Sequence, residues 1–289
     1  MKFDLKTVLV LLFLGFVWGS AFILMKIGAQ SFDYIQMASL RLIFAGLVAV
    51  LFFIYIYKDV KIKDWKFLLL SGVLGNLIPA YLFASVSKEI PSSLSGALNA
   101  LTPLFALVFG AILFKIKFNT RQFIGILIGL IGALVLIFSA NSTNLEFNFQ
   151  YLYPCLKVVV AALLYGINVN IIKSKLNHND AYTNSMVPLT LISIPALFIG
   201  IGNNAFQTAI KPESLTSLLG ILVLGVVGSA LSLIVFNKLV KKTSALFAAS
   251  VTYLIPVFAF LWGIYFKEPV GLIQVFGVSL ILIGIVLTK

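Results

Sequence analysis

The stretch Leu101–Ala106 (LTPLFA) returns later in the chain as Leu254–Ala259 (LIPVFA). Upstream of these two stretches lies a second shared motif, which reads GVLG at residues 72–75 and GVVG at residues 225–228. Both motifs recur at the same offset, and self-similarity at one fixed offset is the sequence signature of an internal repeat. The chain is therefore predicted to contain two copies of one structural unit.

Further matches extend the repeat on both sides of these motifs. The matched pairs are Trp18 with Tyr165, Lys26 with Lys173, Gly110 with Gly263, Gln122 with Gln274, and Gly132 with Gly284. The polar segment 141–148 separates the two copies. The predicted units are a first five-helix repeat, residues 1–144, and a second, inverted five-helix repeat, residues 145–289.

The composition assigns the chain to the membrane. Hydrophobic residues make up 61% of the chain, charged residues only 10%, and the mean hydropathy is +1.10. A soluble domain carries roughly 25% charged residues, so this chain has too little polar surface to cover a globule in water. The net charge of +12 lies mostly in short segments between apolar runs. The lipid bilayer, and no nucleic acid, is the expected macromolecular environment.

Apolar runs long enough to cross a bilayer recur along the whole chain. A spanning helix needs about 20 mostly apolar residues. Ten such runs cover residues 7–29, 33–57, 66–87, 92–114, 119–140, 150–172, 182–201, 214–237, 244–266 and 269–288. Each copy then holds five helices, an odd number, so the second copy enters the membrane from the opposite side. The predicted fold is an all-α integral membrane protein with ten transmembrane helices in a 5+5 inverted-topology repeat.

The basic residues predict the orientation in the membrane. If the N-terminus is cytoplasmic, most lysines fall in cytoplasmic segments. The opposite side holds Lys26, Lys88, Lys211 and Lys267. The positive-inside rule therefore predicts that both termini are cytoplasmic. The richness in Lys, Asn and Ile is typical of an AT-biased genome, and we expect a multi-pass protein of a prokaryotic plasma (inner) membrane.

Several motifs resemble those of the EamA family of the drug/metabolite transporter superfamily. They are Phe16–Phe22 (FVWGSAF), Leu40–Gly46 (LRLIFAG), Pro103, Pro256, and Phe266–Pro269 (FKEP) before a glycine-spaced last helix. The resemblance covers nearly the whole chain. It implies a ten-helix inverted repeat and a central cavity lined mostly by helices other than the fifth and tenth. It also implies export or exchange of amino acids and related metabolites.

One feature departs from the family pattern. The family often places an acidic residue after the fourth helix, where this chain has Lys115–Phe118 (KIKF), whereas the second copy keeps Glu268. This difference is interpreted as a loss of symmetry in a loop contact, without a clear bearing on the substrate.

Polar and aromatic side chains inside the predicted helices are the candidate substrate contacts. An asparagine at lipid depth needs a hydrogen-bond partner, which is either another helix or a ligand. Trp18 and Tyr165 are equivalent in the repeat, and they either stack on a substrate from both halves or pack as ordinary core residues. The predicted substrate-binding residues are Trp18, Asn76, Tyr81, Asn99, Thr102, Lys157, Tyr165, Asn168, Ser229 and Tyr253.

The positions of the charged residues indicate which transport mechanism to expect. Lys26, Arg41 and Lys157 lie inside predicted helices, where charges are costly and usually functional. A cluster of these cations could attract a carboxylate-bearing substrate, whereas snorkelling to the interface, or pairing of Arg41 with backbone carbonyls, is the structural alternative. All nine acidic residues lie in or beside loops. We therefore expect facilitated or exchange transport without a buried carboxylate for coupling.

Two prolines, Pro103 and Pro256, are equivalent in the repeat and are predicted to kink their helices. Symmetric kinks that face one cavity are candidate structural hinges, although kinks without motion are equally compatible with the sequence. The single histidine, His178, lies in a polar loop, and it is interpreted as a solvated residue.

The sequence favours a transporter over an enzyme. It contains no nucleophile–base set, phosphate-binding glycine loop or metal-ligand cluster, so no catalytic residue, metal or cofactor is predicted. The predicted function is secondary transport of small polar metabolites, amino acids or related carboxylates, by export or exchange through alternating access, in a monomer or homodimer. The alternative is a flippase or a carrier of nucleotide-sugar or lipid-linked groups. A long lateral groove would favour lipids, and a closed central cavity would favour soluble metabolites.

Overall fold

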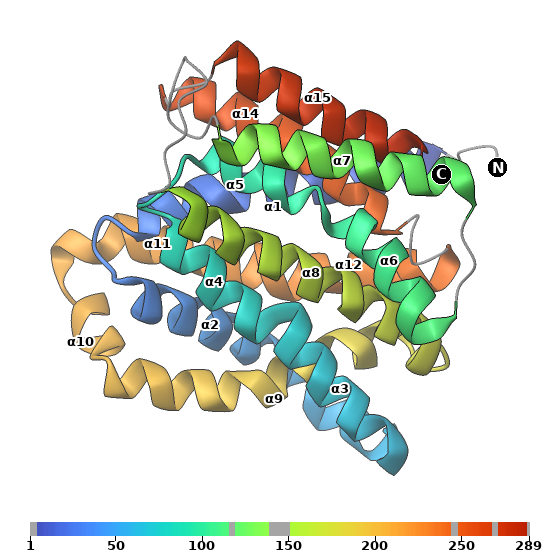
Figure 1. Ribbon diagram of the computed structural model, residues 1–289. Helices are drawn as coiled ribbons and strands as arrows, with labels where there is room; N and C mark the ends of the chain where they lie inside the picture. The colour runs from blue at the N-terminus through green and yellow to red at the C-terminus, as the bar shows by residue number, and fades with distance from the viewer. Residues whose placement is uncertain (1–4, 116–118, 139–150, 244–247, 268–270, 288–289) are drawn as a thin grey trace.

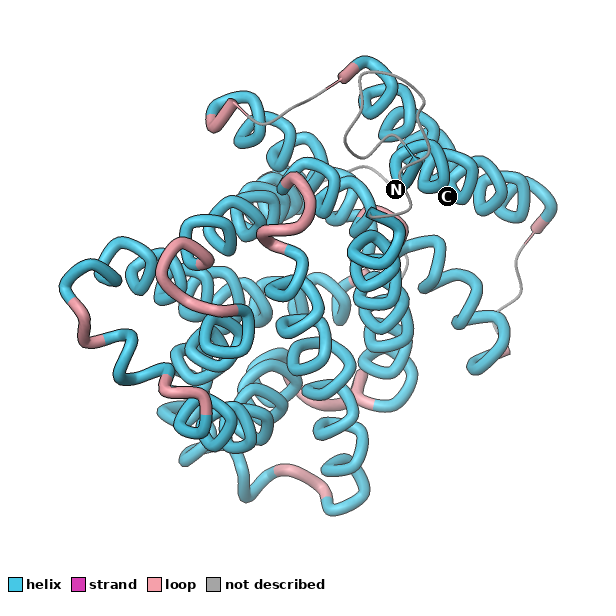
Figure 2. The backbone as a smooth tube through the Cα atoms, turned by 60° about the vertical axis from the view of Figure 1, so that its left-hand side comes forward, coloured by secondary structure: helices cyan, strands magenta, loops and turns pink. Residues whose placement is uncertain are grey.

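The computed structural model of the protein describes residues 5–115, 119–138, 151–243, 248–267 and 271–287. Within these ranges it contains helices and connecting turns and no β-strand (Figures 1 and 2). Seven described helical segments are long and apolar enough to cross a membrane, and three shorter apolar helices accompany them. The all-helical membrane fold is therefore confirmed, whereas the ten crossings and the cytoplasmic termini stay predictions.

The first half contains two long helices, then two broken ones, and then a fifth helix. Its elements are α1 (Leu5–Gly28), α2 (Tyr34–Ile56), η1 (Tyr57–Asp59), η2 (Ile62–Asp64), α3 (Trp65–Gly72), η3 (Val73–Leu77), α4 (Ile78–Val86), α5 (Ser92–Asn99), α6 (Thr102–Phe114) and α7 (Thr120–Phe138). The predicted boundary between the repeats, at residues 144 and 145, lies outside the described residues, and so does Glu268.

The second half has a similar order of elements, but the short helix α10, which was not predicted, takes the place of η1, and the described part has η7 where the first half has α5. Its elements are α8 (Leu152–Lys175), α9 (Ala181–Gly202), α10 (Ala205–Ala209), η5 (Pro212–Ser214), α11 (Leu215–Gly225), η6 (Val226–Leu231), α12 (Ser232–Lys242), η7 (Ser250–Tyr253), α14 (Leu254–Tyr265) and α15 (Leu272–Leu287). The helices follow the predicted apolar runs closely, except that α12 continues to Lys242, beyond its predicted end at residue 237.

Two equivalent helices begin at equivalent aspartates. The Asp33 carboxylate accepts the backbone N–H groups of Ile35 and Gln36, both at 2.8 Å, and the Gln36 side chain accepts the N–H of Asp33. This reciprocal capping box satisfies donors that a helix start leaves open. Asp180 caps α9 in a similar way, through the N–H of Thr183 at 2.7 Å. The sequence thus sets the start of α2 and α9 locally.

The two halves pack on each other at reciprocal positions. A Cβ added to Gly19 of α1 would lie 2.5 Å from Cβ of Phe258, and one added to Gly166 of α8 would lie 2.8 Å from Cβ of Phe105. These two contacts correspond to each other in the repeat. Helix α1 therefore approaches α14 as α8 approaches α6, and both approaches require a residue without a side chain.

The equivalent helices α7 and α15 also pack on each other, and they run antiparallel. A Cβ on Gly132 would lie 2.7 Å from the carbonyl oxygen of Gly277, and one on Gly284 would lie 2.5 Å from that of Gly125. The late glycine of each helix thus faces the early glycine of the other. Figure 1 shows the pair side by side at one edge of the bundle. Helices α2 and α9 form a second extensive contact between equivalent elements.

Two segments of π-helix interrupt helices that were predicted to be regular. The first, η3, joins α3 to α4, and the second, η6, joins α11 to α12 at the equivalent place. A π-helix bonds each residue to the fifth one along the chain, and such turns are frequent at functional sites. The hydroxyls of Ser229 in η6 and of Ser232, the first residue of α12, donate to the carbonyls of Leu224 and Val227, each five residues earlier.

The two repeat prolines follow helix breaks and do not kink continuous helices. Pro103 is in the first turn of α6, after Ala100 and Leu101 separate α5 from α6. Pro256 is in the first turn of α14, directly after the 3-10 turn η7. Proline is tolerated in a first turn because its missing N–H has no intrahelical partner there. The predicted kinks are therefore corrected to breaks, and the hinge role stays a prediction.

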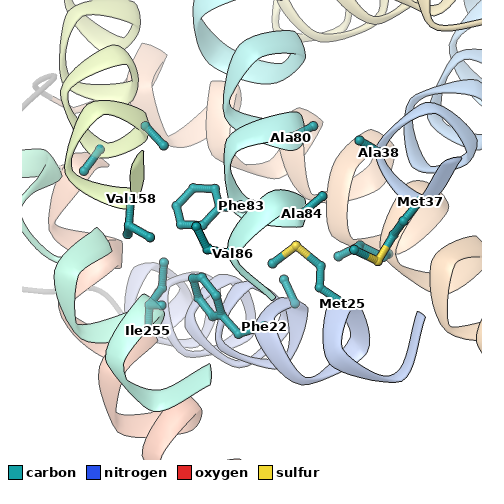
Figure 3. Close-up of a cluster of buried hydrophobic side chains, with 14 of the residues drawn as sticks. Phe22, Met25, Met37, Ala38, Ala80, Phe83, Ala84, Val86, Val158 and Ile255 are labelled. Carbon is teal, nitrogen blue, oxygen red and sulfur yellow. The ribbon is translucent and has the colours of Figure 1, made fainter. Parts of the chain in front are cut away.

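A cluster of buried apolar side chains lies where the halves meet. Figure 3 shows Phe22 of α1, Phe83 of α4, Val158 of α8 and Ile255 of α14 converging in one buried cluster. All four side chains are buried or nearly so. This cluster borders the polar cavity that is described next.

Candidate functional site

A cavity of about 110 Å³ lies between the two halves. Its lining comes from helices and helix breaks of both halves, and none of the lining residues belongs to α7 or α15. This agrees with the expectation that the fifth and tenth helices contribute little to the central cavity.

Most of the lining residues form pairs that are equivalent in the repeat. The pairs are Trp18 with Tyr165, Ala21 with Asn168, Phe22 with Val169, Gly75 with Gly228, Asn76 with Ser229, Phe83 with Phe236, Asn99 with Thr252, and Thr102 with Ile255. The remaining lining residues are Met25, Arg41, Leu233 and Ala249. The cavity therefore lies on the seam between two surfaces at equivalent positions of the repeat, although most of the paired residues differ.

Aromatic rings form two walls of the cavity. The ring of Tyr165 stacks on Phe83, with centroids 6.0 Å apart, and Phe22 meets Phe83 edge-on at 5.5 Å. On the other side Trp18 lies 5.2 Å from Phe236. Rigid rings of this kind provide a large contact surface for the apolar part of a ligand.

Arg41 is the charged residue of the lining. Its Nε donates a hydrogen bond to Oγ of Ser229 in the other half at 3.0 Å. A guanidinium carries five N–H donors, and within the described residues Arg41 has no carboxylate partner and no other hydrogen bond. Tyr165 lies near enough to interact with it electrostatically. The cavity therefore contains a positive charge whose remaining donors are open to a ligand.

Helix η6 also receives a bond from α1. The indole Nε1 of Trp18 donates to the carbonyl oxygen of Gly228 at 3.0 Å. This carbonyl belongs to the π-helical segment, next to the Ser229 that holds Arg41. The first half thus contacts η6 twice, through Trp18 and through Arg41.

The asparagines of the lining keep unused hydrogen-bonding capacity. Oδ1 of Asn168 is buried without a partner in the described structure, and the amide of the same residue lies against Gly75 with no room for a Cβ. Thr102 donates to the backbone oxygen of Asn99 at 2.8 Å and lies 3.4 Å from Oδ1 of Asn99. The side chain of Asn76 has no hydrogen bond to any described residue. These amides are available to polar groups of a substrate.

Most of the predicted site residues come together in this cavity. Those that line it are Trp18, Asn76, Asn99, Thr102, Tyr165, Asn168 and Ser229, with Arg41 beside them. The side chain of Tyr253 lies outside the part of the chain that the structure describes. Phe22, Phe83 and Phe236 were missed, although the pairing of Phe83 with Phe236 in the repeat is a signal that could have identified these two.

Two predicted contacts lie elsewhere, and the predicted cluster of cations does not form in the cavity. The hydroxyl of Tyr81 shares a hydrogen bond of 2.8 Å with Ser39 between α4 and α2. Lys157 lies eight residues before Tyr165, which is about 12 Å along α8, so it does not reach the cavity. It pairs with Glu89 at 3.2 Å. Lys26 is also absent from the lining, so Arg41 is its single cation.

Comparison with known proteins identifies the family. The model of the EamA-like transporter family matches residues 5–138 and 152–289. The uncharacterized inner membrane transporter YedA of Escherichia coli (strain K12) is 23% identical over 251 residues, which cover 86% of this chain and 78% of that protein. The uncharacterized transporter YvbV of Bacillus subtilis is 25% identical and covers 98% and 92%.

A plant protein and a solved structure extend the comparison. The WAT1-related protein At3g02690, chloroplastic, of Arabidopsis thaliana is 25% identical over 95% of this chain and 67% of its own length. A protein of known crystal structure superposes with a TM-score of 0.69 at 16% identity, over 97% of this chain and 95% of that chain. At that identity the likeness shows the fold.

The family match covers nearly all the described helices, and relatives are inner membrane transporters. The chain therefore belongs to the EamA-like transporter family of the drug/metabolite transporter superfamily, and it is a multi-pass protein of a bacterial-type plasma membrane.

Proposed function

We propose that the protein is a secondary transporter that moves small polar metabolites, amino acids or related carboxylates, through the cavity between its halves. Transport in general is the activity of the family and of the named relatives. The observation that supports the rest is the cavity itself, in which polar side chains and one cation are enclosed between equivalent elements of both halves.

The proposed mechanism is alternating access in a ten-helix inverted repeat of residues 1–144 and 145–289, with both termini in the cytoplasm. Two similar units that face opposite ways can exchange their conformations, and the cavity then opens to one side and next to the other. Antiparallel packing of α7 on α15 supports this arrangement. The breaks before Pro103 and Pro256 are the proposed hinges, because they border the cavity through Thr102 and Ile255.

The size of the cavity supports a small substrate. Pockets for drug-sized ligands usually enclose about 300 Å³ or more, whereas this cavity has about 110 Å³. A nucleotide sugar or a lipid-linked group would need far more space than this conformation offers. The aromatic walls and the amides of Asn76, Asn99 and Asn168 suit a compact molecule with both apolar and polar parts.

The distribution of acids supports exchange or facilitated transport. No aspartate or glutamate is among the lining residues. The buried carboxylate of Asp64 lies at the start of α3, and it is hydrogen-bonded to His178 at 2.7 Å. Coupling to an ion through a carboxylate in the cavity is therefore not part of the proposal.

Counterflow in proteoliposomes tests the proposed function. A panel of amino acids, other carboxylates, nucleotide sugars and fluorescent lipids would be offered to the wild-type protein. The expected result is saturable exchange of small carboxylates, which Asn99→Ala lowers and Lys157→Ala leaves unchanged, because only Asn99 lines the cavity. Movement of lipids or nucleotide sugars alone would refute the proposal in favour of a flippase or nucleotide-sugar carrier.

A further inference from the structure

We infer that Arg41 binds the carboxylate of the substrate with the terminal nitrogens of its guanidinium, while Ser229 of the opposite half holds its Nε, so that the substrate binds in one orientation. This inference rests on the proposed function, because it assigns the substrate class and the polarity of the same cavity.

The charge balance of the cavity is the first argument. An arginine inside a membrane protein is costly unless an anion or a set of carbonyls compensates its charge. The described part of the chain supplies Arg41 with one hydroxyl, that of Ser229, and with no carboxylate. An anionic ligand in the cavity would supply the missing partner, and its own burial cost would be offset by the same contact.

The geometry at Ser229 is the second argument. Its hydroxyl donates to the carbonyl of Leu224 at 3.2 Å and accepts from Nε of Arg41 at 3.0 Å. The single proton of Ser229 is thus committed to the backbone, which leaves a lone pair for Nε. With Nε fixed, the two terminal nitrogens keep a fork of N–H donors that matches the two oxygens of a carboxylate.

The broken symmetry of the lining is the third argument. Arg41 corresponds in the repeat to Pro188, which carries no charge and does not line the cavity. Ser229 corresponds to Asn76, whose side chain has no hydrogen bond to the described residues. The carboxylate therefore has one binding place, near η6. The other polar groups of the substrate then face Asn76 and η3 across the cavity.

Ser229 is a positioning residue in this scheme, and Arg41 is a substrate-binding residue. Removing the guanidinium of Arg41 should abolish recognition of the carboxylate. Removing the Ser229 hydroxyl should keep the positive charge, but the guanidinium would no longer be held in one orientation. Lysine at position 41 would keep a point charge without the planar fork. The structure also offers a matched control, because Ser232 lies in the adjoining turn and bonds to the backbone of Val227 without lining the cavity.

The experiment uses the full-length protein in detergent and in proteoliposomes. L-alanine, L-leucine, L-phenylalanine and the amide of each are the probes, because an amide lacks the negative charge. Binding is measured by ligand-induced thermal shift, and exchange by counterflow. We expect the acids to bind the wild type at least tenfold more tightly than the amides. We expect Arg41→Gln to weaken acid binding about 100-fold and to remove this preference.

The other variants separate positioning from charge. We expect Ser229→Ala to weaken acid binding about five- to tenfold, Arg41→Lys to fall between Ser229→Ala and Arg41→Gln, and Ser232→Ala to match the wild type. Size-exclusion chromatography of each variant shows whether it is folded, and Ser229→Ala and Arg41→Lys keep the test decisive if Arg41→Gln does not fold.

The outcomes distinguish this inference from the proposed function. If the wild type exchanges the acids and the Arg41 variants bind them equally well, the inference is wrong and the proposed function stands. Equal binding of acids and amides by the wild type would likewise overturn the inference alone. If the wild type neither binds nor exchanges any amino acid or other small carboxylate, both the inference and the proposed function are wrong.

Discussion

Gly19 and Gly166, which correspond in the repeat, both press against a backbone of the opposite half, whereas Gly75 and Gly228 correspond as well but have different neighbours. A Cβ on Gly75 would collide with the amide of Asn168, while the nearest atom to a Cβ on Gly228 is Cδ1 of Leu224 at 3.2 Å. The two halves are thus alike where their helices pack and unlike where they line the cavity. This contrast indicates that the packing is shared by the two copies and that the cavity is specialised.

The largest effects are expected where the halves are alike. Gly166→Ala would bring a Cβ within 2.7 Å of the backbone nitrogen of Ala106, and Gly19→Ala would bring one within 3.0 Å of the carbonyl oxygen of Ile255. Overpacking of this kind costs about 1–3 kcal/mol. We expect both variants to lose thermal stability by similar amounts in detergent.

Gly202→Ala is the control for these two variants, because its Cβ would have no neighbour within 4 Å. If Gly166→Ala kept the thermal stability of the wild type while Gly19→Ala lost stability, the two packing sites would not be equivalent.

The next effect concerns contacts between the halves at the two ends of the bundle. Nε2 of His178 lies 2.7 Å from the buried carboxylate of Asp64, and the equivalent residues, Ser31 and Ser217, share a hydrogen bond of 3.1 Å. His178→Ala would leave a buried carboxylate without this partner, which costs about 1–3 kcal/mol. Ser31→Ala should cost less, because Ser217 keeps its bond to the carbonyl of Ile27 at 2.8 Å.

Thermal unfolding at neutral pH measures this difference. Equal stability of His178→Ala and Ser31→Ala would show that the two ends are energetically alike, despite the carboxylate at one of them.

A smaller effect, on transport and not on stability, is expected at the glycines of the π-helical segments. Gly75→Ala displaces the flexible amide of Asn168 from its place in the cavity, so counterflow should fall about three- to tenfold, in line with the loss of one hydrogen-bond partner. Gly228→Ala has more room and should stay within about twofold of the wild type. Equal loss in both variants would mean that Asn168 contributes nothing specific.

The smallest effect is expected at an ion pair that has no counterpart at the equivalent positions of the repeat. Lys157 and Glu89 pair at 3.2 Å, whereas the equivalent residues are Val10 and Lys242. Partly exposed pairs contribute about 0–1 kcal/mol. Lys157→Ala should therefore lower the melting temperature only slightly and leave counterflow unchanged. Loss of counterflow would restore the interpretation of Lys157 as a substrate contact.

The sequence was sufficient for the helices and for much of the cavity. Apolar runs of about 20 residues mark helices directly, and the repeat offset shows which helices are equivalent. Polar residues such as Asn99 and Asn168 stand out in apolar helices, so their place in the cavity could be predicted. The three cavity phenylalanines could not be distinguished from the other 23 of the 26 phenylalanines without structure or repeat pairing, because phenylalanine is common throughout the chain.

The rest depends on contacts between distant segments. Tyr81 was predicted to line the cavity because the sequence does not show which face of a helix a residue occupies, and it faces Ser39 of α2. Lys157 was predicted to line it as well, but it lies too far along α8 and pairs with Glu89 in the turn after α4. His178 is exposed, as expected of a solvated loop residue, but its contact with Asp64 was not predicted because Asp64 belongs to the other half. The π-helical segments are also invisible in sequence, since the motif at residues 72–75 is compatible with an ordinary helix.

The segments η3 and η6 set the rotation of the helices that follow them. A π-helical turn holds more residues than the α-helical turn that it replaces. Each additional residue rotates everything beyond it by about 100° about the helix axis. Both copies carry the segment at the same place, so α4 and α12 present their cavity residues, Phe83 and Phe236, after the same added rotation.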